Sequence, residues 1–416
     1  AMTAELQLGI DLGTTLSVAA ICSDGNVSVV RVDGEPTTPS AVWFNKGSGI
    51  VVGRKALAAR ARDPGYVVYG AKRVIGLDHA DPDRLQAVSG LPFDFAPVSK
   101  PGEWHGATGF RLPNDRVVTP EQIGAIVLKR LKHAAEQSPI LDWMRRTFGF
   151  TFQSVTVSVP VTFTDAQRKA TIRACRMAGF SREVRLIEEP IAAAVAFGLG
   201  REKATSRVLV FDIGGGTLDI ALLYFNAYSG TFYVETTSGE SHLGGEDFDR
   251  ILADLALAQA PDAARAAAIR ASPSAMQELL GAAEAAKRLL SYEPRATLCL
   301  PDASGSPADE PGTVVLSQSC AAPVVVTVQA FEQASAAHRA RAMDAVQRAL
   351  DDAGLSRDVE LDVVLVGGSS RIPSLRTDLA EYLPRATQHF RGVDPDQAVA
   401  IGAAKSWGCA HSGRRS

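Results

Sequence analysis

Two short segments of the sequence combine an aspartate, glycines and threonines in a pattern that suits phosphate and metal chemistry. The first is GIDLGTTLSVAAI, around Asp11, and the second is VFDIGGGTLDIALL, around Asp212. Each polar turn lies between apolar runs, which predicts a β-hairpin. Glycines let the main chain approach an oxyanion closely, and clustered N–H groups form an anion-binding concavity. An aspartate beside such a turn cannot favour phosphate by itself, so it indicates a cation, Mg²⁺ held through water.

The duplication of this pattern, 201 residues apart, is more specific than either copy. A single glycine-rich turn is an ordinary tight turn roughly half the time. Two copies predict two related halves that hold one nucleotide from both sides. The sequence has no Walker A motif, no G-x-G-x-x-G, no H-E-x-x-H and no G-x-S-x-G. Phosphate binding must therefore use the paired hairpins.

Composition limits the classes of partner. The 416 residues leave room for two to three domains with sizeable cores. Lys and Arg total 43 and Asp and Glu 46, a net charge of −3, so no basic surplus points to nucleic acid or an anionic membrane. No signal segment is visible, and the longest apolar stretch, 208–225, is interrupted by two aspartates and three glycines. We expect a soluble protein that binds neither nucleic acid nor membrane.

The five cysteines are scattered, without a Cys-x-x-Cys pair or a metal-type Cys/His spacing. We expect reduced, mostly structural thiols, which suits a cytoplasmic location.

The elements that position the two turns alternate between strands and helices, which predicts mixed α/β halves. In the first half, Thr119 is a good N-cap and Pro120 suits the first position of an amphipathic helix. After it we expect a strand at 154–159, a helix at 165–178, a strand at 185–188, and an alanine-rich helix from Pro190 to about Gly198.

In the second half, Gly244 and Gly245 lead into a helix with acids in its first turn, as the helix dipole prefers. Ser274-x-x-Gln277 predicts a capping box for the next helix, and 294–323 is expected to hold strands joined by a long loop. The other expected elements are hairpins at 208–224 and 231–237, helices at 331–352 and 374–383, and a strand at 361–366.

Eight ordered motifs resemble the nucleotide-binding domain of the heat-shock protein 70 (DnaK-type) chaperones, from residue 8 to about 408. They are GIDLGTT, AKRVIG, IEEPIAAAVAFGL, FDIGGGTLD, GGEDFD, AAKRLLS, VLVGGSSRIP and DPDQAVAIGAA. The resemblance implies an α/β, actin-like ATPase fold with two ribonuclease-H-like lobes around a central nucleotide cleft. The implied divisions are lobe I at 1–203 (core 6–40 and 119–203, inserted subdomain 41–118), lobe II at 204–409 (core 204–243 and 330–409, inserted subdomain 244–329) and a tail at 410–416.

The resemblance assigns roles around the phosphates of ATP or ADP. Asp11 and Asp212 match two aspartates that face Mg²⁺ through water, and K⁺ is a further candidate cation. Lys72 matches the catalytic lysine, whose compact ammonium can touch the γ-phosphate and fix the attacking water. Glu189 matches a carboxylate that orients metal-bound water. Asp219 matches another near the attacking water, where cation coordination explains it as well as general-base catalysis. The implied phosphate contacts are Gly13, Thr14, Thr15, Leu16, Gly214, Gly215, Gly216 and Thr217.

For the nucleoside, one helical face carries Glu284, Lys287, Arg288 and Ser291 at i, i+3, i+4 and i+7. Alone, such a face is usually a solvated set of charge pairs, but in the family it holds ribose and adenine. Arg371 matches an arginine stacked on the purine, a task that suits a planar guanidinium. The other expected contacts are Gly244, Gly245, Glu246, Gly367, Gly368, Ser369, Ile372 and Asp396.

The family couples nucleotide state to a substrate domain through co-chaperones. Pro160 and Arg168 match the proline switch and its arginine partner, and Arg185 matches an arginine that engages J-domain co-chaperones. A nucleotide-exchange factor is expected at 244–329. Unfolded client proteins are expected through a substrate domain that is missing here, and Ala1-Met2, read as a tag remnant, favours a truncated chain over a natural short member.

The chain departs from the family at several positions. Glu188 replaces the usual Asn, Leu16 stands where many members have an aromatic residue, and 133–153 and 294–323 look longer than usual. We expect a chaperone-type, Mg²⁺-dependent ATPase with slow basal turnover, since no arginine finger is evident. The alternatives are a nucleotide-binding pseudoenzyme or co-chaperone adaptor, an actin-like filament protein, and a small-molecule kinase.

Overall fold

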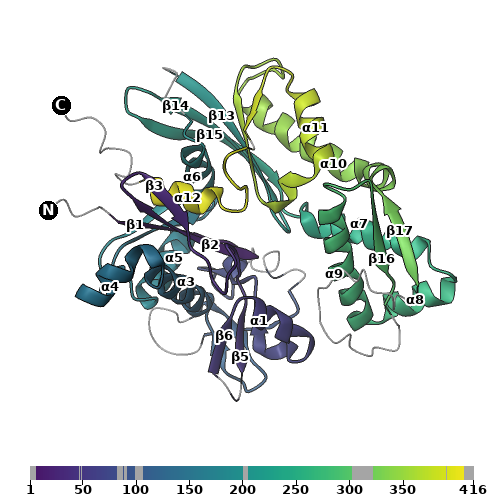
Figure 1. The fold of residues 1–416 in the computed structure, drawn as a ribbon, viewed down its shortest axis with the longest axis horizontal. Helices are drawn as coiled ribbons and strands as arrows, with labels where there is room; N and C mark the ends of the chain where they lie inside the picture. The colour runs from purple at the N-terminus through teal and green to yellow at the C-terminus, as the bar shows by residue number, and fades with distance from the viewer. Residues whose placement is uncertain are drawn as a thin grey trace. The chain divides into compact units, whose positions relative to one another are not determined.

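The computed structural model describes residues 6–45, 47, 49–81, 88, 91–98, 106–199, 205–301, 322–389 and 391–406. The chain forms two compact units (Figure 1): unit 1 is Ala1–Glu202 together with Arg391–Ser416, and unit 2 is Lys203–Phe390. Each unit contains its own five-stranded path of paired strands and its own helices, so the predicted mixed α/β class is confirmed for both.

Unit 1 is built on a sheet with the strand order β12-β11-β1-β2-β3, in which β4 also pairs with β2. Strands β1, β2 and β3 form an antiparallel meander, and β11 and β12 run parallel to β1. The hairpin predicted around Asp11 is confirmed by the pairing of β1 with β2. The strands are β1 (Gln7–Leu12), β2 (Leu16–Ser23), β3 (Asn26–Val29), β4 (Thr38–Pro39), β11 (Val155–Val159) and β12 (Val184–Glu188).

The sheet of unit 2 repeats this topology, with the order β15-β14-β13-β18-β19. Strands β13, β14 and β15 form the antiparallel meander, and β18 and β19 run parallel to β13. The hairpin predicted around Asp212 is confirmed, since Asp212 pairs with Asp219 across it. Two sheets with the same order and directions agree with the two related halves expected from the duplicated turns. The strands are β13 (Thr205–Ile213), β14 (Leu218–Asn226), β15 (Thr231–Glu240), β18 (Asp362–Val366) and β19 (Thr387–His389).

The main helix of unit 1, α3, begins as its sequence predicts. Thr119 Oγ1 accepts the N–H of Gln122 at 3.1 Å, and Gln122 Oε1 accepts the N–H of Thr119 at 2.9 Å, so two donors without a helical partner are satisfied. Its apolar residues Ile123, Val127 and Leu131 are buried in the core of unit 1. The helices of this unit are α1 (Arg54–Ala58), α3 (Pro120–Glu136), α4 (Asp142–Phe148), α5 (Asp165–Met177), α6 (Glu189–Ala196) and α12 (Ala398–Lys405).

The stretch expected as an inserted subdomain at 41–118 forms two small three-stranded sheets, β6-β5-β7 and β10-β9-β8. It also contains the short 3-10 helix η3 (Ala71–Val74), which carries Lys72. The strands are β5 (Val42–Asn45), β6 (Gly49–Val52), β7 (Val67–Val68), β8 (Asp94–Pro97), β9 (Thr108–Arg111) and β10 (Val117–Val118).

The chain returns to unit 1 near its end, and this differs from the predicted division, which placed residues up to 409 in the second lobe. Helix α12 packs on β1, β2 and α6. A Cβ added to Gly402 would lie 1.7 Å from Ala192 O, and one added to Gly9 would lie 2.1 Å from Ala404 N. The missing side chains let the backbones approach this closely, so 391–406 belong with unit 1; the expected tail at 410–416 lies outside the described residues.

The helices of unit 2 form two groups in Figure 1, with α10 and α11 beside the sheet and α7, α8 and α9 beside a two-stranded sheet of β16 and β17. The predicted cap at Ser274 is wrong: Ser272 Oγ accepts the N–H of Ala275, and Pro273 is the first helical residue of α9. Helix α8 was not predicted. The elements are α7 (Gly245–Ala258), α8 (Ala263–Ala271), α9 (Pro273–Leu289), β16 (Arg295–Cys299), β17 (Pro323–Thr327), α10 (Val328–Asp352) and α11 (Pro373–Tyr382).

The cysteines do not all behave as expected. Cys22 and Cys299 are each disulfide-bonded, whereas Cys175 is a free thiol buried in the core of unit 1. The prediction of reduced thiols is therefore wrong at two positions, and the cytoplasmic location that rested on it stays a prediction without that support.

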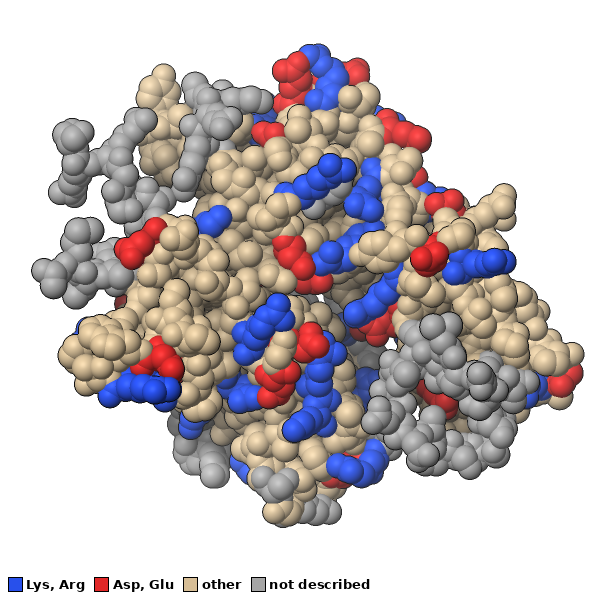
Figure 2. All heavy atoms as spheres, in the orientation of Figure 1, with Lys and Arg blue, Asp and Glu red and all other residues tan. Residues whose placement is uncertain are grey.

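Two surface properties bear on partners. No helix within the described part of the chain is long and apolar enough to span a membrane. On the face shown in Figure 2, acidic and basic side chains are interspersed.

The close contact of α12 with α6 gives a stability prediction. We expect Gly402→Ala to destabilise unit 1 by about 3 kcal/mol, because the new Cβ overlaps the Ala192 carbonyl. Gly281→Ala, inside α9, is the matched control, since its Cβ would meet nothing within 4 Å, and it should stabilise by about 0.5–1 kcal/mol through helix propensity. Urea unfolding measures both changes. Equal stability of wild type and Gly402→Ala would contradict the packing.

Candidate functional site

The site in unit 1 forms where parallel strands end at one edge of the sheet. Pairing of Gly9 with Thr156 and Ile10 with Val157 puts Asp11 level with Ser158 on the neighbouring strand. Ser158 Oγ donates a hydrogen bond to Asp11 Oδ1 at 2.8 Å. Because β12 runs parallel to β11, its last residue and the start of α6 reach the same edge. Ser158 was not predicted, although its place at the end of a buried strand is a usable signal.

Lys72 and Glu189 meet at this edge, although 117 positions separate them in the sequence. Lys72 Nζ donates a hydrogen bond to Glu189 Oε1 in an ion pair whose side chains are 11% and 20% exposed. The ammonium also lies 6.0 Å from the centre of the Phe163 ring. The ion pair orients the lysine. Because the pair is partly buried, solvent screens its attraction less than that of a surface pair. The structure thus brings together two residues that were predicted to be catalytic.

The Asp11 carboxyl has a raised pKa. Its burial raises the pKa to about 6, the Lys72 charge opposes that rise, and the Glu189 and Asp396 charges add to it. Asp396, predicted at the rim of lobe II, therefore lies within electrostatic reach of Asp11 in unit 1. Several carboxylates with a single ammonium among them favour the approach of a cation.

Hydrogen bonds that involve two serines, Ser40 and Ser17, hold the turn after Asp11 in place. Ser40 Oγ donates to Gly13 O at 2.7 Å and lies 2.8 Å from Ser17 Oγ, which is buried. The N–H of Ser40 donates to Thr15 O at 2.8 Å. The Thr15 side chain remains exposed, and those of Thr14 and Leu16 are partly exposed. The turn therefore presents its hydroxyls to solvent; Ser40 was not predicted.

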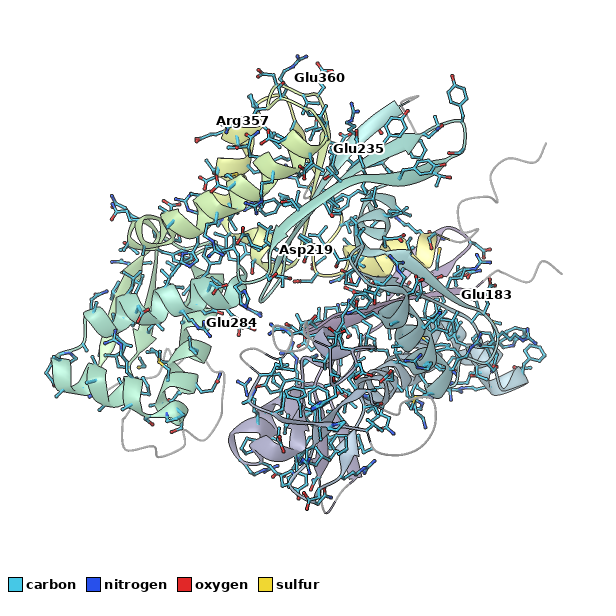
Figure 3. All side chains as sticks on the ribbon, turned by 180° about the vertical axis from the view of Figure 1, so that it is seen from behind. Glu183, Asp219, Glu235, Glu284, Arg357 and Glu360 are labelled. Atoms are coloured by element: carbon cyan, nitrogen blue, oxygen red, sulfur yellow. The ribbon has the colours of Figure 1, made fainter. Side chains whose placement is uncertain are left out.

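In unit 2 the second turn connects β13 and β14. The N–H of Gly214 donates to Thr217 O at 3.0 Å, which closes the turn. Thr217 Oγ1 donates to Asp219 Oδ2 at 3.1 Å, and both side chains are exposed. Asp219 is labelled in Figure 3 on the hairpin that carries this turn. Asp212, at the end of β13, pairs directly with Asp219, so two predicted carboxylates lie side by side.

The segment that begins α7 packs onto this turn through its backbone. The N–H of Gly245 donates to Gly214 O at 2.9 Å, and Glu246 N–H donates to Gly215 O at 2.8 Å. A Cβ on Gly244 would lie 2.5 Å from Gly216 N, so no larger residue fits there without rearrangement. The helix dipole of α7 starts at this point, which makes the cluster suitable for an anion.

The loop after β18 completes the cluster. Ser369 Oγ donates to Gly214 O at 2.9 Å, and a Cβ on Gly367 would lie 2.7 Å from Asp212 Oδ1. Gly367 has φ of 79°, a left-handed conformation that favours glycine. Gly368 and Arg371 begin and end the short 3-10 helix η5 (Gly368–Arg371). Ile372 is buried and Arg371 is partly exposed. Three segments that are distant in sequence thus meet in unit 2.

The predicted nucleoside face on α9 separates into an outer and an inner part. Glu284, labelled in Figure 3, pairs with Arg288 at 2.6 Å, and both side chains are exposed. Lys287 turns inward: its ammonium lies 2.8 Å from Asp249 Oδ1 and donates to Gly245 O at 2.9 Å. Ser291 Oγ donates to Lys287 O at 3.4 Å. Lys287 therefore joins α9 to the start of α7, a role that the sequence did not reveal.

Asp249 is the partner that sequence reasoning missed, although it is the last residue of GGEDFD. Its side chain and that of Lys287 are each 12% exposed. Burial raises the Asp249 pKa to about 6, against the lowering effect of the Lys287 charge. The ion pair thus compensates only part of the desolvation.

Glu188, which replaces the asparagine expected from the resemblance, forms an ion pair with Arg168 at 3.1 Å. Arg168 Nε also donates to Phe163 O at 3.1 Å. Arg168, which was expected to partner the proline switch, therefore pairs with a charged residue. Arg185, the residue expected to meet J-domain proteins, pairs with Glu183 at 2.7 Å and is partly exposed.

Within the described residues, no group of three or more His, Cys, Asp or Glu side chains is arranged to hold a metal ion directly. Asp11 fits a hydrated divalent cation, since its partly buried carboxylate lies within electrostatic reach of two further acids, Glu189 and Asp396.

Comparison with known proteins identifies the family. The model of the family described as "Hsp70 protein" matches residues 7–414. "Heat shock 70 kDa protein BIP3" from Oryza sativa subsp. japonica is 36% identical over 400 residues, which cover 95% of this chain and 55% of the relative. The chain thus spans about half the length of the curated relative that it matches.

The Asp249 carboxyl predicts how stability changes with pH. Its folded pKa, about 6, lies above the ordinary value of 3.8, so the folded state binds more protons between pH 4 and 6. Stability should fall as pH rises through that window, by up to about 3 kcal/mol for this group. Asp249→Asn should remove this part of the slope. Chemical denaturation at pH 4.5 and 7 measures it, and an unchanged slope in the variant would contradict the assignment.

Proposed function

Because the chain belongs to the Hsp70 family, we propose that it binds Mg²⁺–ATP and hydrolyses it to ADP and phosphate as the nucleotide-binding part of a chaperone. The observation that carries the proposal is the Lys72–Glu189 ion pair beside the partly buried carboxyl of Asp11. This arrangement places an oriented ammonium next to acids that favour a cation, which phosphoryl transfer requires.

The proposal extends to the architecture. The two sheets of equal topology support an actin-like fold made of two ribonuclease-H-like lobes. Each carries one Asp–Gly–Thr hairpin turn at the same place in its meander. We infer that both turns contribute to the binding of one nucleotide, as their duplication suggests.

Within unit 1, the proposed chemistry follows from the contacts. Bound Mg²⁺ would neutralise charge on the phosphates. Asp11 would hold its water ligands, with Ser158 fixing the carboxylate orientation. Lys72 would donate to the γ-phosphate and the attacking water, while Glu189 keeps the ammonium in place. The hydroxyls of Thr14 and Thr15, on a turn held by Ser40, would donate to phosphate oxygens.

Within unit 2, the side chains of Thr217, Asp212 and Asp219 would contact the phosphate and the metal-bound water. The glycines of the three packed loops would let the phosphate approach the backbone closely. Arg371 is proposed to stack on the purine, and the exposed Glu284–Arg288 pair to meet the ribose. Lys287 acts from behind by holding Gly245 in position. Asp219 is also a candidate general base, and its partner Thr217 would set its orientation.

The proposed partners follow the family. We propose a J-domain co-chaperone at Arg185, a nucleotide-exchange factor at 244–329, and unfolded clients bound by a substrate domain. Slow basal hydrolysis is expected, because an arginine finger is worth about 10³- to 10⁵-fold where one is present and no such group was evident in the sequence.

Single-turnover hydrolysis of Mg²⁺–ATP tests the function. We expect Lys72→Ala to hydrolyse ATP roughly 10²-fold or more slowly than wild type, since it removes a donor to the transferring phosphoryl group. ATP binding, measured by calorimetry, should persist. Lys55→Ala, an exposed lysine on α1, is the control and should keep the wild-type rate.

Two outcomes would contradict parts of this proposal. Equal rates for wild type and Lys72→Ala would remove the lysine from the mechanism. ATP that stabilises the wild type by about 2.7 kcal/mol at a hundredfold excess over Kd, without release of phosphate, would select the pseudoenzyme instead.

A further inference from the structure

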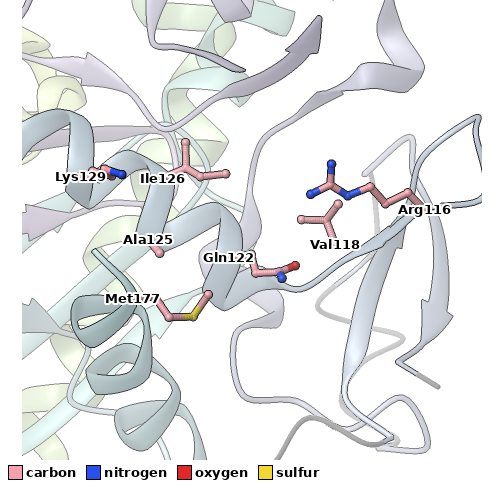
Figure 4. Close-up of a pocket in the computed structure, with 7 residues that line it drawn as sticks. All are labelled: Arg116, Val118, Gln122, Ala125, Ile126, Lys129 and Met177. Carbon is pink, nitrogen blue, oxygen red and sulfur yellow. The ribbon is translucent and has the colours of Figure 1, made fainter. Parts of the chain in front are cut away.

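A cavity of about 260 Å³ opens on unit 1 where α3, β10 and the end of α5 meet, and no residue of the proposed nucleotide site lines it. Its apolar walls include Val118, Ile126 and Met177 (Figure 4). Met177 is 40% exposed, which is high for a methionine beside a buried helix. The volume matches one or two apolar side chains rather than a whole metabolite.

Three hydrogen-bond donors surround these walls. Arg116 and Lys129 lie at opposite ends of the cavity in Figure 4, with Gln122 between them. Gln122 uses Oε1 for the cap of α3, which leaves its amide N–H₂ group available. The Arg116 guanidinium lies over the Phe44 ring at 5.5 Å, so it is held beside the cavity. No carboxylate lines the cavity.

The two cations of the cavity have no acidic partner among the residues that the structure describes. Neither Arg116 nor Lys129 forms an ion pair there. Their neighbours Arg130 and Arg173 are paired with acids, with Asp33 and Glu121 respectively, whereas Arg116 and Lys129 keep their charge available to a ligand. Positive charge without internal compensation beside an apolar wall is complementary to an acidic, apolar ligand.

The form of the cavity decides what presents that ligand. A metabolite site usually buries most of its ligand, whereas Arg116, Lys129 and Met177 are all exposed. Gln122, Ile126 and Lys129 follow one another at helical spacing along α3, so the donors and the wall form a stripe rather than an enclosed chamber. Such a stripe suits a segment of chain laid across it.

We propose that this cavity is a docking site for a protein partner, which inserts a large apolar side chain flanked by acidic residues. The apolar side chain packs against Ile126 and Met177, and the flanking carboxylates pair with Arg116 and Lys129. Gln122 donates its amide N–H to the segment. This surface is separate from the proposed ATP chemistry and does not depend on it.

The probe is the blocked peptide acetyl-Glu-Leu-Phe-Glu-amide, titrated into the whole chain with ¹³C-labelled methionine and isoleucine methyl groups. We expect saturable shifts of the Met177 and Ile126 methyl signals. The same peptide with Gln in place of Glu should bind more weakly, and higher salt should weaken the binding of the acidic peptide. The double variant Arg116→Gln, Lys129→Gln should raise the Kd roughly threefold to tenfold, as expected for two exposed ion pairs.

The matched control is Lys55→Gln with Lys169→Gln, which removes two exposed lysines of unit 1 that do not line the cavity; it should leave the Kd unchanged. Absence of a saturable Met177 shift would overturn the proposal. So would equal affinity for the Glu and Gln peptides, or an unchanged Kd in the double cavity variant. The Gln peptide keeps the test valid even if a variant folds poorly.

Discussion

The candidate site depends on one electrostatic constraint: the carboxyl of Asp11 is partly buried where β1, β11 and β12 end together. Removal from water disfavours its ionised form. Lys72 offsets this cost and Ser158 donates to the carboxylate, while Glu189 both anchors the lysine and adds negative charge. This edge therefore carries an excess of negative charge, which a divalent cation would neutralise. Its residues come from four separate stretches of sequence and are held together by the parallel strands.

Unit 2 uses a different means of holding its loops. Backbone bonds join the turn at Gly214 to the loop at Gly245, and the Ser369 hydroxyl donates to Gly214 O from the loop after β18. The buried Lys287–Asp249 pair ties α9 to the start of α7. A buried ion pair contributes little net stability but is costly to break. It is thus suited to fixing position, which is the role that the contact with Gly245 gives it.

Local chemistry in the sequence was a reliable guide where a residue acts through its own neighbours. The hairpins at Asp11 and Asp212 and the cap at Thr119 were predicted because period, glycine and N-cap signals are local. Contacts made by distant residues were not predictable from such signals. No sequence spacing identifies the partners of Asp249, Ser158 and Ser40. The cap was predicted at Ser274, which matches a capping-box motif, although Ser272 is the actual N-cap. The disulfides at Cys22 and Cys299 and the return of 391–406 to unit 1 are tertiary facts of the same kind.

The packing of α12 against β1 and α6 has a consequence for the order in which the molecule assembles. Unit 2 is one continuous stretch, so its sheet can form as soon as that stretch has left the ribosome. Unit 1 needs Gly402 and its neighbours to cover Gly9 and Ala192, and those residues are synthesised almost 400 positions after β1. During translation the sheet of unit 1 therefore keeps one side uncovered until unit 2 and the segment that contains α12 have been synthesised.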